Sequence, residues 1–289
     1  MLVPMVTGLQ SMIEKTTNKL GVENDAESFK KLSIQISLNG LSFCVLDTNI
    51  NTITYLKHIP LDKKSTPLKV LDILENTFKT ENVLQASYSN VHVIHDNELS
   101  TIVPKEFFND NHLADYLKFN SKILKSDFIA YDEININNSI NVYVPYVNIN
   151  NFIYDMFGSF SYKHISTILI EKILEAEKFA NNDKMYVHVE QSHFNVVVVS
   201  NGKLKLYNTF EFNTKEDFIY YILFTAEQLE LDPETLDVIL LGRIKSDDEN
   251  YNIIYKYIRH ISFGTRFDDY KFSSAPKSNH SDFPLIHSF

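Results

Sequence analysis

The chain has 289 residues, a length typical of about two domains, and it can bury a core without a metal or disulfide. Apolar residues make up 44% of it and charged residues 22%, which predicts an ordered fold rather than a disordered chain. The net charge of −10 disfavours general nucleic-acid binding because an acidic surface repels phosphates. The single cysteine, Cys44, excludes an internal disulfide and fits a reducing compartment.

The N-terminus lacks the charged segment and apolar run of a secretory signal. No stretch approaches the ~18 apolar residues of a membrane-spanning helix. We therefore predict a cytoplasmic protein without a membrane span, whose first 30 residues form a polar, partly helical extension.

Strict alternation of apolar and polar residues begins at Leu32 and predicts a β-hairpin. Asn39-Gly40 lies between two alternating runs, and this pair favours positive φ at both central positions of a type I′ turn. A third strand is expected at residues 52–59. Pro67 then begins an apolar series at helical spacing, which predicts an amphipathic helix.

The next part of the chain carries weaker patterns. Strands are predicted at residues 83–88 and 91–95, and Pro104 is interpreted as the first-turn proline of another helix. Later residues are less regular, with strands expected near 128–131 and 140–147 and helices near 151–157 and 166–179.

The opening pattern returns at Met185. Alternating strands on either side of a second Asn-Gly pair, Asn201-Gly202, predict another type I′ hairpin. A capping-box pattern at residues 214–217 begins a helix, although Asp replaces the usual Glu or Gln. The continuous apolar run at residues 238–241 predicts a strand in the centre of a sheet.

Both halves have the order hairpin, third strand, helix and strand, which predicts an internal duplication. A shift of 153 residues places Ile36 on Val189, Leu41 on Phe194, Phe43 on Val196, Val45 on Val198 and Ile53 on Leu206. The predicted organisation is an N-terminal extension (1–30), a first half (31–120), a connecting region (121–182), a second half (183–265) and a C-terminal tail (266–289). Residues 283–286 are expected to form a last strand within this tail.

The duplicated plan resembles that of the actin-like and Hsp70-like ATPases. The segment Val187–Val199 is similar in shape to the second phosphate loop of that superfamily, and Val238–Gly242 is similar to the strand and first glycine of its adenosine motif. The layout is also similar to that of the cytoplasmic pilus-assembly relatives of actin. The resemblance implies an α/β fold of two duplicated ribonuclease-H-like halves, each with a mixed sheet flanked by helices.

Three longer phrases are more specific. They are IVPKEFF (Ile102–Phe108), EDFIYYILFTAEQLELDP (Glu216–Pro233) and LLGRI (Leu240–Ile244). In this order they resemble the uncharacterised Bacteroidetes family called domain of unknown function 3822, over most of the chain from about Leu32. That family has no established activity, so the resemblance implies a bacterial protein of actin-like fold and no particular function.

An actin-like ATPase needs glycine turns that let backbone N–H groups approach the phosphates, and an Asp that holds the magnesium hydration shell. The first loop of this chain has Ser37 at the Asp position, then Asn39 and one glycine, Gly40. The whole chain has 7 glycines, well below the typical frequency of about 7%. Such a chain has little capacity for phosphate-binding loops.

The second loop departs further from the ATPase pattern. His188 takes the Asp position, and Glu190 places a negative charge where the phosphates would lie. In the adenosine motif, Arg243 replaces the second glycine. The side chains expected to converge on this degenerate cleft are Ser37, Asn39, Gly40, His188, Glu190, Gln191, Ser192, His193, Gly242 and Arg243.

These substitutions predict no catalytic residue, no metal site and no nucleotide cofactor. The leading hypothesis is a non-catalytic, actin-like scaffold or interaction protein, a pseudo-ATPase whose partner is another protein or a second copy of itself. The tyrosine-rich helix at residues 218–222 is apolar on more than one face and offers such a contact. The alternative is a divergent nucleotide-binding or small-molecule-binding protein, or an enzyme, that uses the interdomain cleft. A third hypothesis is membrane attachment through the N-terminus or residues 283–289, although neither carries a basic amphipathic helix.

Overall fold

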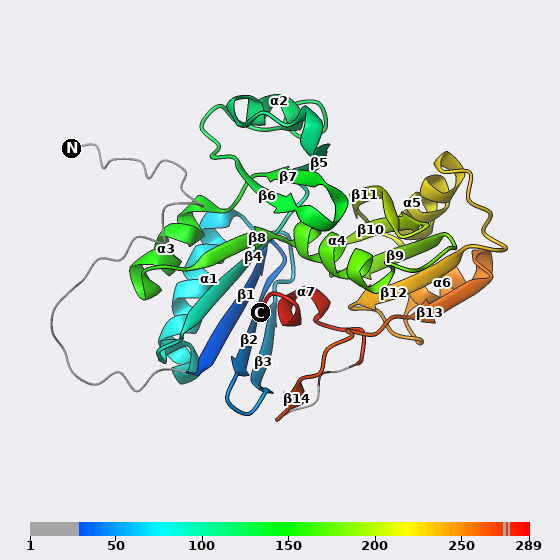
Figure 1. The fold of residues 1–289 in the computed structure, drawn as a ribbon. Coiled ribbons are helices and arrows are strands. Elements are labelled where there is room, and N and C mark those ends of the chain that lie inside the picture. The colour runs from blue at the N-terminus through cyan, green and yellow to red at the C-terminus, as the bar shows by residue number, and fades with distance from the viewer. Residues whose placement is uncertain (1–28, 274–275, 277) are drawn as a thin grey trace, which may run out of the picture.

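Two larger β-sheets lie side by side, with helices between them and on their outer faces (Figure 1). The computed structural model describes residues 29–273, 276 and 278–289. The predicted N-terminal extension therefore lies almost entirely outside the described residues. Within the described ranges, no helix is both long enough and apolar enough to cross a membrane.

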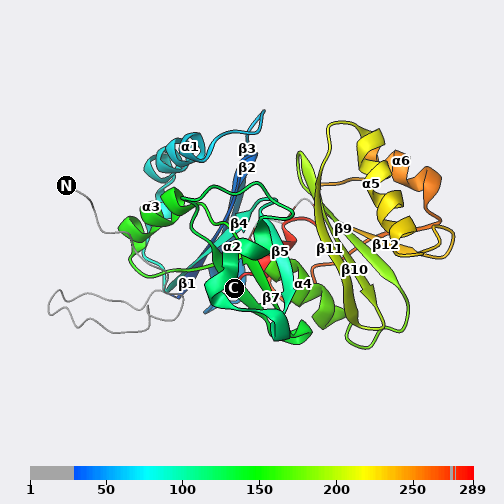
Figure 2. The same ribbon diagram turned by 90° about the horizontal axis from the view of Figure 1, so that it is seen from above.

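The first sheet has six strands, which are β1 (Lys30–Ser37), β2 (Gly40–Asp47), β3 (Thr52–Pro60), β4 (Asn90–Asp96), β8 (Ser161–His164) and β14 (Lys271–Phe272). Their order is β14-β3-β2-β1-β4-β8, with β1 antiparallel to β2 and parallel to β4. Its outer face is covered by α1 (Pro67–Thr80) and α3 (Val147–Phe157) (Figure 2). Thr66 caps α1, and Val70, Leu74 and Phe78 form its buried side.

The second sheet has five strands, which are β9 (Lys184–Val189), β10 (His193–Ser200), β11 (Lys203–Glu211), β12 (Asp237–Gly242) and β13 (His260–Phe263). Their order is β11-β10-β9-β12-β13, with β9 antiparallel to β10 and parallel to β12. Its outer face is covered by α5 (Lys215–Gln228) and α6 (Glu249–Tyr257). The predicted capping box is confirmed, because the side chains of Thr214 and Asp217 each accept from the other residue's backbone N–H.

The two sheets share one pairing pattern, down to the same irregularity. A β-bulge lies between Val45 and Leu46 in the first sheet and between Val198 and Val199 in the second, 153 residues later. The third strands, β3 and β11, do not correspond at a shift of 153 residues, because the turn before β3 is two residues longer than the turn before β11. Ile53 therefore corresponds to Leu204, and the predicted equivalence with Leu206 is wrong.

The two Asn-Gly pairs form different turns. Asn201 and Gly202 have φ of 49° and 69°, so the second hairpin has the predicted type I′ turn. The prediction for Asn39-Gly40 is wrong, because neither residue has positive φ and Gly40 already belongs to β2. Backbone N–H groups of the loop after β3 bind the turn carbonyls, and a Cβ on Gly40 would lie 2.8 Å from the oxygen of Ile59. Glycine is needed there for close strand approach.

A third, smaller sheet is formed by residues that lie in the sequence between β4 and β8 of the first sheet. It contains β5 (Ser100–Pro104), β6 (Ala130–Ile134) and β7 (Ser139–Tyr143), in the order β5-β7-β6, with α2 (Leu113–Leu117) packed on it. The helix predicted to begin at Pro104 does not begin there, and the α-helical part of this segment is Leu113–Leu117. Pro104 ends β5, and the side chain of Asn109 accepts from the N–H of Asn111, which favours short turns over a continuous helix.

Short 3₁₀ turns complete this part of the chain, at Asn82–Gln85, Lys105–Phe107, Asp110–His112 and Asn135–Asn137. The first of them overlaps the strand predicted at residues 83–88, which is therefore wrong. Only Leu84 of this turn is buried, so the segment has no alternating face to place on a sheet.

The inner layer between the two large sheets consists of α4 (Ile165–Ala176) and α7 (Phe283–Ile286). Residues of α7 were predicted as a strand, but they form a helix with every residue buried. Pro284 is compatible with a first helical turn, and the segment satisfies its buried backbone internally through the N–H of Ile286 and the oxygen of Asp282. Residues 283–286 are buried, so their apolar side chains are not available to a membrane in this structure.

We expect Leu285→Ala to lower the free energy of unfolding by about 2–5 kcal/mol, because it opens a cavity where both sheets meet. Urea unfolding measures this change. The matched control is Leu68→Ala on α1, whose side chain is 69% exposed and which should change stability by less than about 0.5 kcal/mol. Equal effects of the two substitutions would show that α7 is not part of the core.

Candidate functional site

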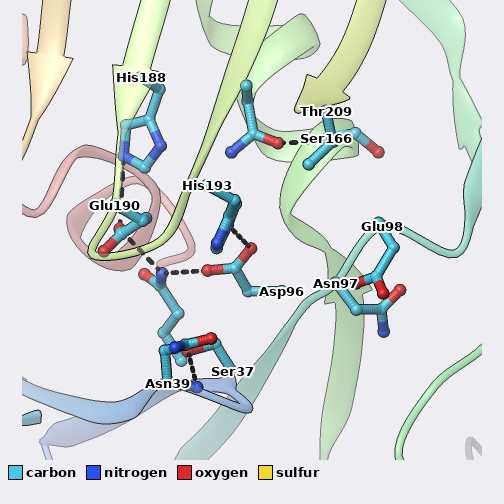
Figure 3. A network of polar contacts seen from close by, with 12 residues as sticks. Ser37, Asn39, Asp96, Asn97, Glu98, Ser166, His188, Glu190, His193 and Thr209 are labelled. Carbon is cyan, nitrogen blue, oxygen red and sulfur yellow. Dashed lines mark hydrogen bonds and ion pairs between the residues drawn. The ribbon is translucent and has the colours of Figure 1, made fainter. Parts of the chain in front are cut away.

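Polar side chains meet where the ends of β1, β4 and β9 face each other between the two large sheets. Figure 3 shows Asp96 and His193 pointing toward one another, with Glu190 beside them. Asp96 ends β4, Glu190 directly follows β9, and His193 begins β10. This is the place where the resemblance to actin-like ATPases puts the phosphates.

An ion pair between Asp96 and His193 joins the two halves. The distance between Oδ1 of Asp96 and Nε2 of His193 is 2.9 Å, and both side chains are buried. The side chain of Gln35 donates to Oδ2 of Asp96 at 3.2 Å and to Glu190 at 3.3 Å. Gln35 thus connects the acidic groups of both halves.

The protonation of this pair follows from the proximity of the two groups. Burial alone would lower the pKa of His193, but the charge of Asp96 and its hydrogen bond raise that pKa to about 9. Burial alone would raise the pKa of Asp96, yet the charge and hydrogen bond of His193 hold it below its ordinary value. At neutral pH the pair is therefore imidazolium and carboxylate.

A second cross-cleft contact is made by Arg243. Its Nε donates to Glu190 at 2.7 Å, and its Nη2 donates to the hydroxyl of Ser42 at 3.3 Å. The Ser42 hydroxyl is in turn 3.0 Å from Nδ1 of His58, whose pKa burial and the charge of Arg243 lower to about 4. Neutral His58 accepts a hydrogen bond from the Ser42 hydroxyl, which leaves the hydroxyl oxygen free to accept from Arg243.

The rim of the cleft is closed by further contacts between the halves. Gln191 donates to the backbone oxygen of Leu61 at 2.9 Å. Lys64 pairs with Glu98 at 3.0 Å and also contacts Glu211 on β11. These exposed ion pairs add little stability by themselves, but they cover the buried network.

The Ser37 side chain of the first loop makes its hydrogen bonds within the loop itself. Ser37 donates to the backbone oxygen of Gly40 and accepts from the N–H of Asn39, both at 3.2 Å. The hydroxyl that replaces the ATPase carboxylate thus stabilises its own turn. Ser192, on the opposite loop, lines the remaining space, and its backbone oxygen accepts from Phe212.

His188 and Gly242 serve packing. His188 is buried, burial lowers its pKa, and its Nε2 lies 3.8 Å from Glu190, beyond hydrogen-bond distance. Gly242 has φ of 81°, and a Cβ there would lie 2.3 Å from the oxygen of Val189. The glycine that resembles the first glycine of the adenosine motif is therefore required by the contact between β12 and β9 itself.

The space left between the two loops is small. The cavity between the two loops has a volume of about 10 Å³, which is at the lower limit for one water molecule. Asp96, Glu98 and Glu211 line it, and Gln35 bridges Asp96 to Glu190. Each of these carboxylates would repel a phosphate. The cations that could offset this charge, His193, Arg243 and Lys64, are already paired with those carboxylates.

Sequence reasoning missed several residues of this network. Asp96, Gln35 and Lys64 were not among the predicted residues, although Asp96 immediately follows the strand predicted at residues 91–95. The parallel pairing of β1 and β4 places Ser37 opposite Asp96, so their ends share one edge of the sheet. The position of a charged residue at the end of a strand was the available signal.

Other candidates have structural environments. Cys44 is fully buried, and burial raises the pKa of its thiol, as for a packing residue. His92 and His95 lie three apart on β4 and contact different groups, Ser161 and Asn150. Across the described ranges, no three His, Cys, Asp or Glu side chains are grouped to hold a metal ion.

The tyrosine-rich helix has a buried and an exposed side. Phe218, Ile219 and Ile222 lie in the core, whereas Tyr220 and Phe224 are 58% and 42% exposed and stack with ring centroids 5.9 Å apart. The predicted second apolar face therefore exists on α5.

Comparison with solved structures places the chain among proteins of actin-like ATPase fold. A Bacteroides thetaiotaomicron protein with this fold and unknown function is 24% identical, with a TM-score of 0.74 over 82% of this chain and 91% of that chain. A chain of the PilM-PilN type IV pilus biogenesis complex is 8% identical, with a TM-score of 0.55 over 89% of this chain and 94% of that chain. The predicted fold class is confirmed.

The family follows from the sequence match. The model of DUF3822, a protein of unknown function, matches residues 19–261. The chain belongs to the DUF3822 family, as the phrases quoted above predict. Comparison with curated proteins finds no match.

We expect Asp96→Asn to lower the free energy of unfolding by about 3 kcal/mol near pH 6, because it removes one partner of a buried ion pair. Because the pKa of Asp96 is depressed, the stability that its charge contributes is present above about pH 4 and is lost in acid. Because the pKa of His193 is raised, the stability that its charge contributes is fully present below about pH 6.5. That stability is lost as pH rises through about 9.

The difference between wild type and Asp96→Asn should therefore shrink between about pH 6.5 and about pH 10, as measured by urea unfolding. Asp155→Asn, at an exposed position on α3, is the control and should be neutral at every pH. A difference that stays constant across this range would show that the two side chains are not an ion pair.

Proposed function

We propose that this protein is a non-catalytic, actin-like scaffold that binds another protein or a second copy of itself. The observation that carries the proposal is the filled cleft, in which side chains from both halves take the place of a nucleotide. Gln35, Asp96 and His193 form the centre of this arrangement. A protein with such a cleft has lost the feature through which actin-like ATPases act.

Charge and bonding both support a permanently filled cleft. Admitting a triphosphate would require breaking the contacts of Glu190 with Arg243 and Gln35 and exposing the Asp96–His193 pair. Separating a buried, hydrogen-bonded ion pair costs several kcal/mol, and the incoming phosphates would then face the released carboxylates. The closed arrangement is favoured over a nucleotide-bound one by both terms.

Protein contact is the function that remains for such a fold. The exposed aromatic pair Tyr220 and Phe224 on α5 is a surface feature typical of interaction sites. The PilM-PilN complex provides a precedent for a protein of this fold in an assembly with another protein. A cytoplasmic location, which the single buried thiol favours, is part of the proposal.

A thermal-shift screen tests the proposal. We expect ATP, ADP and GTP at about 1 mM, with and without magnesium, to leave the melting temperature unchanged, whereas a ligand at 100 times its dissociation constant adds about 2.7 kcal/mol. An actin-like ATPase with intact glycine loops is the positive control. A magnesium-dependent rise that Glu190→Ala and Arg243→Ala abolish would instead establish the alternative, a divergent nucleotide-binding protein.

A further inference from the structure

A groove of about 840 Å³ separates the small sheet from the second large sheet. Its walls are the edge strand β5 on one side and residues 204–209 of the edge strand β11 on the other. The two strands are neighbours in both ribbon views (Figures 1 and 2). The groove is distinct from the filled cleft, which it meets at Glu98 and Glu211.

Both walls present unpaired strand edges. β11 pairs with β10 alone, and β5 pairs with β7 alone. Every second residue of such a strand points its N–H and C=O away from the partner strand. In the described part of the chain, these outward groups have no backbone partner. Among the N–H groups of β11, that of Thr209 donates to the side-chain oxygen of Asn208.

The duplicated fold shows how such an edge is filled. β3 is the repeat equivalent of β11, and its outer edge receives a short extended segment of the chain itself, β14. The N–H groups of Lys271 and Ser273 donate to the oxygens of Asn51 and Ile53 at 3.0 Å. Among the described residues, no strand pairs with the same edge of β11, which faces the groove. The third strand of this repeat therefore accepts an added strand.

The side chains of the groove indicate the chemistry of that strand. Ile102, Leu204 and Leu206 provide apolar contacts along the walls. Glu98 and Glu211 lie at one end, where both pair with Lys64, which offsets one of their two charges. Lys122 and Lys205 also line the groove, are exposed, and form no ion pair with any described residue. Together the three lysines exceed the two glutamates by one charge, so the groove is slightly positive although the whole chain is acidic.

We infer that this groove binds an extended, acidic segment of a partner protein, which adds to β11 as a further strand. Backbone hydrogen bonds to β11 hold the segment, and its carboxylates contact Lys122 and Lys205. Residues 204–209 span about 20 Å, room for about six residues of an added strand. The inference deepens the proposed scaffold function and rests on it, by naming the kind of partner and where it binds.

The test is selection of random peptides of about 12 residues, displayed on phage, against the full chain. We expect enriched peptides to combine alternating apolar residues with Asp or Glu. Synthetic copies should slow hydrogen exchange of the amides at residues 204–209, which belong to an open edge in the free protein. The double substitution Lys122→Glu and Lys205→Glu should weaken their binding at least about tenfold.

The matched control is Lys69→Glu on α1, an exposed lysine far along the chain from the groove, which should leave peptide affinity unchanged. The inference is overturned if no peptide is enriched, if bound peptides protect α5 instead of β11, or if charge reversal has no effect. Protection of α5 would leave the proposed interaction function intact. A magnesium-dependent nucleotide shift would overturn that function itself, so the two failures are distinguishable.

Discussion

The buried carboxylate of Asp96 is the group on which the closed form of this protein depends. A charge removed from water costs several kcal/mol unless it is paired and hydrogen-bonded. Its partners come from both halves of the molecule, His193 from the second and Gln35 from the first. Separating the halves would leave this charge without a partner, so the contact favours the closed arrangement of the cleft. The same contact lies where the resemblance to actin-like ATPases puts the phosphates.

The duplication gives both halves the same strand arrangement, and the two copies differ at the outer edges of their sheets. Both carry the same meander and the same bulge after Val45 and Val198. In the first sheet, the outer edge of the third strand is covered by β14. In the second sheet, the equivalent edge faces a groove that the inserted small sheet creates. One repeat is closed by the chain itself, and the other remains open to an added strand.

Membership of DUF3822 and the likeness to the Bacteroides thetaiotaomicron structure define the fold and leave the function to the site. The site argues against the activity for which the fold is named. Glu190 binds Arg243 at the position of a glycine loop, and Ser37 binds its own turn. The fold presents two different surface features, the exposed aromatic face of α5 and the groove beside β11.

The sequence by itself determined most of the strands, the second hairpin turn and the capping box of α5, because periodicity and turn chemistry are local properties. It failed at residues 83–88, after Pro104 and at α7, where burial decided between weak local preferences. The pairing of Asp96 with His193, 97 residues apart, was decided by tertiary structure alone. Local patterns place residues on elements, but only the packing of β4 against the second half determines which charged ends meet.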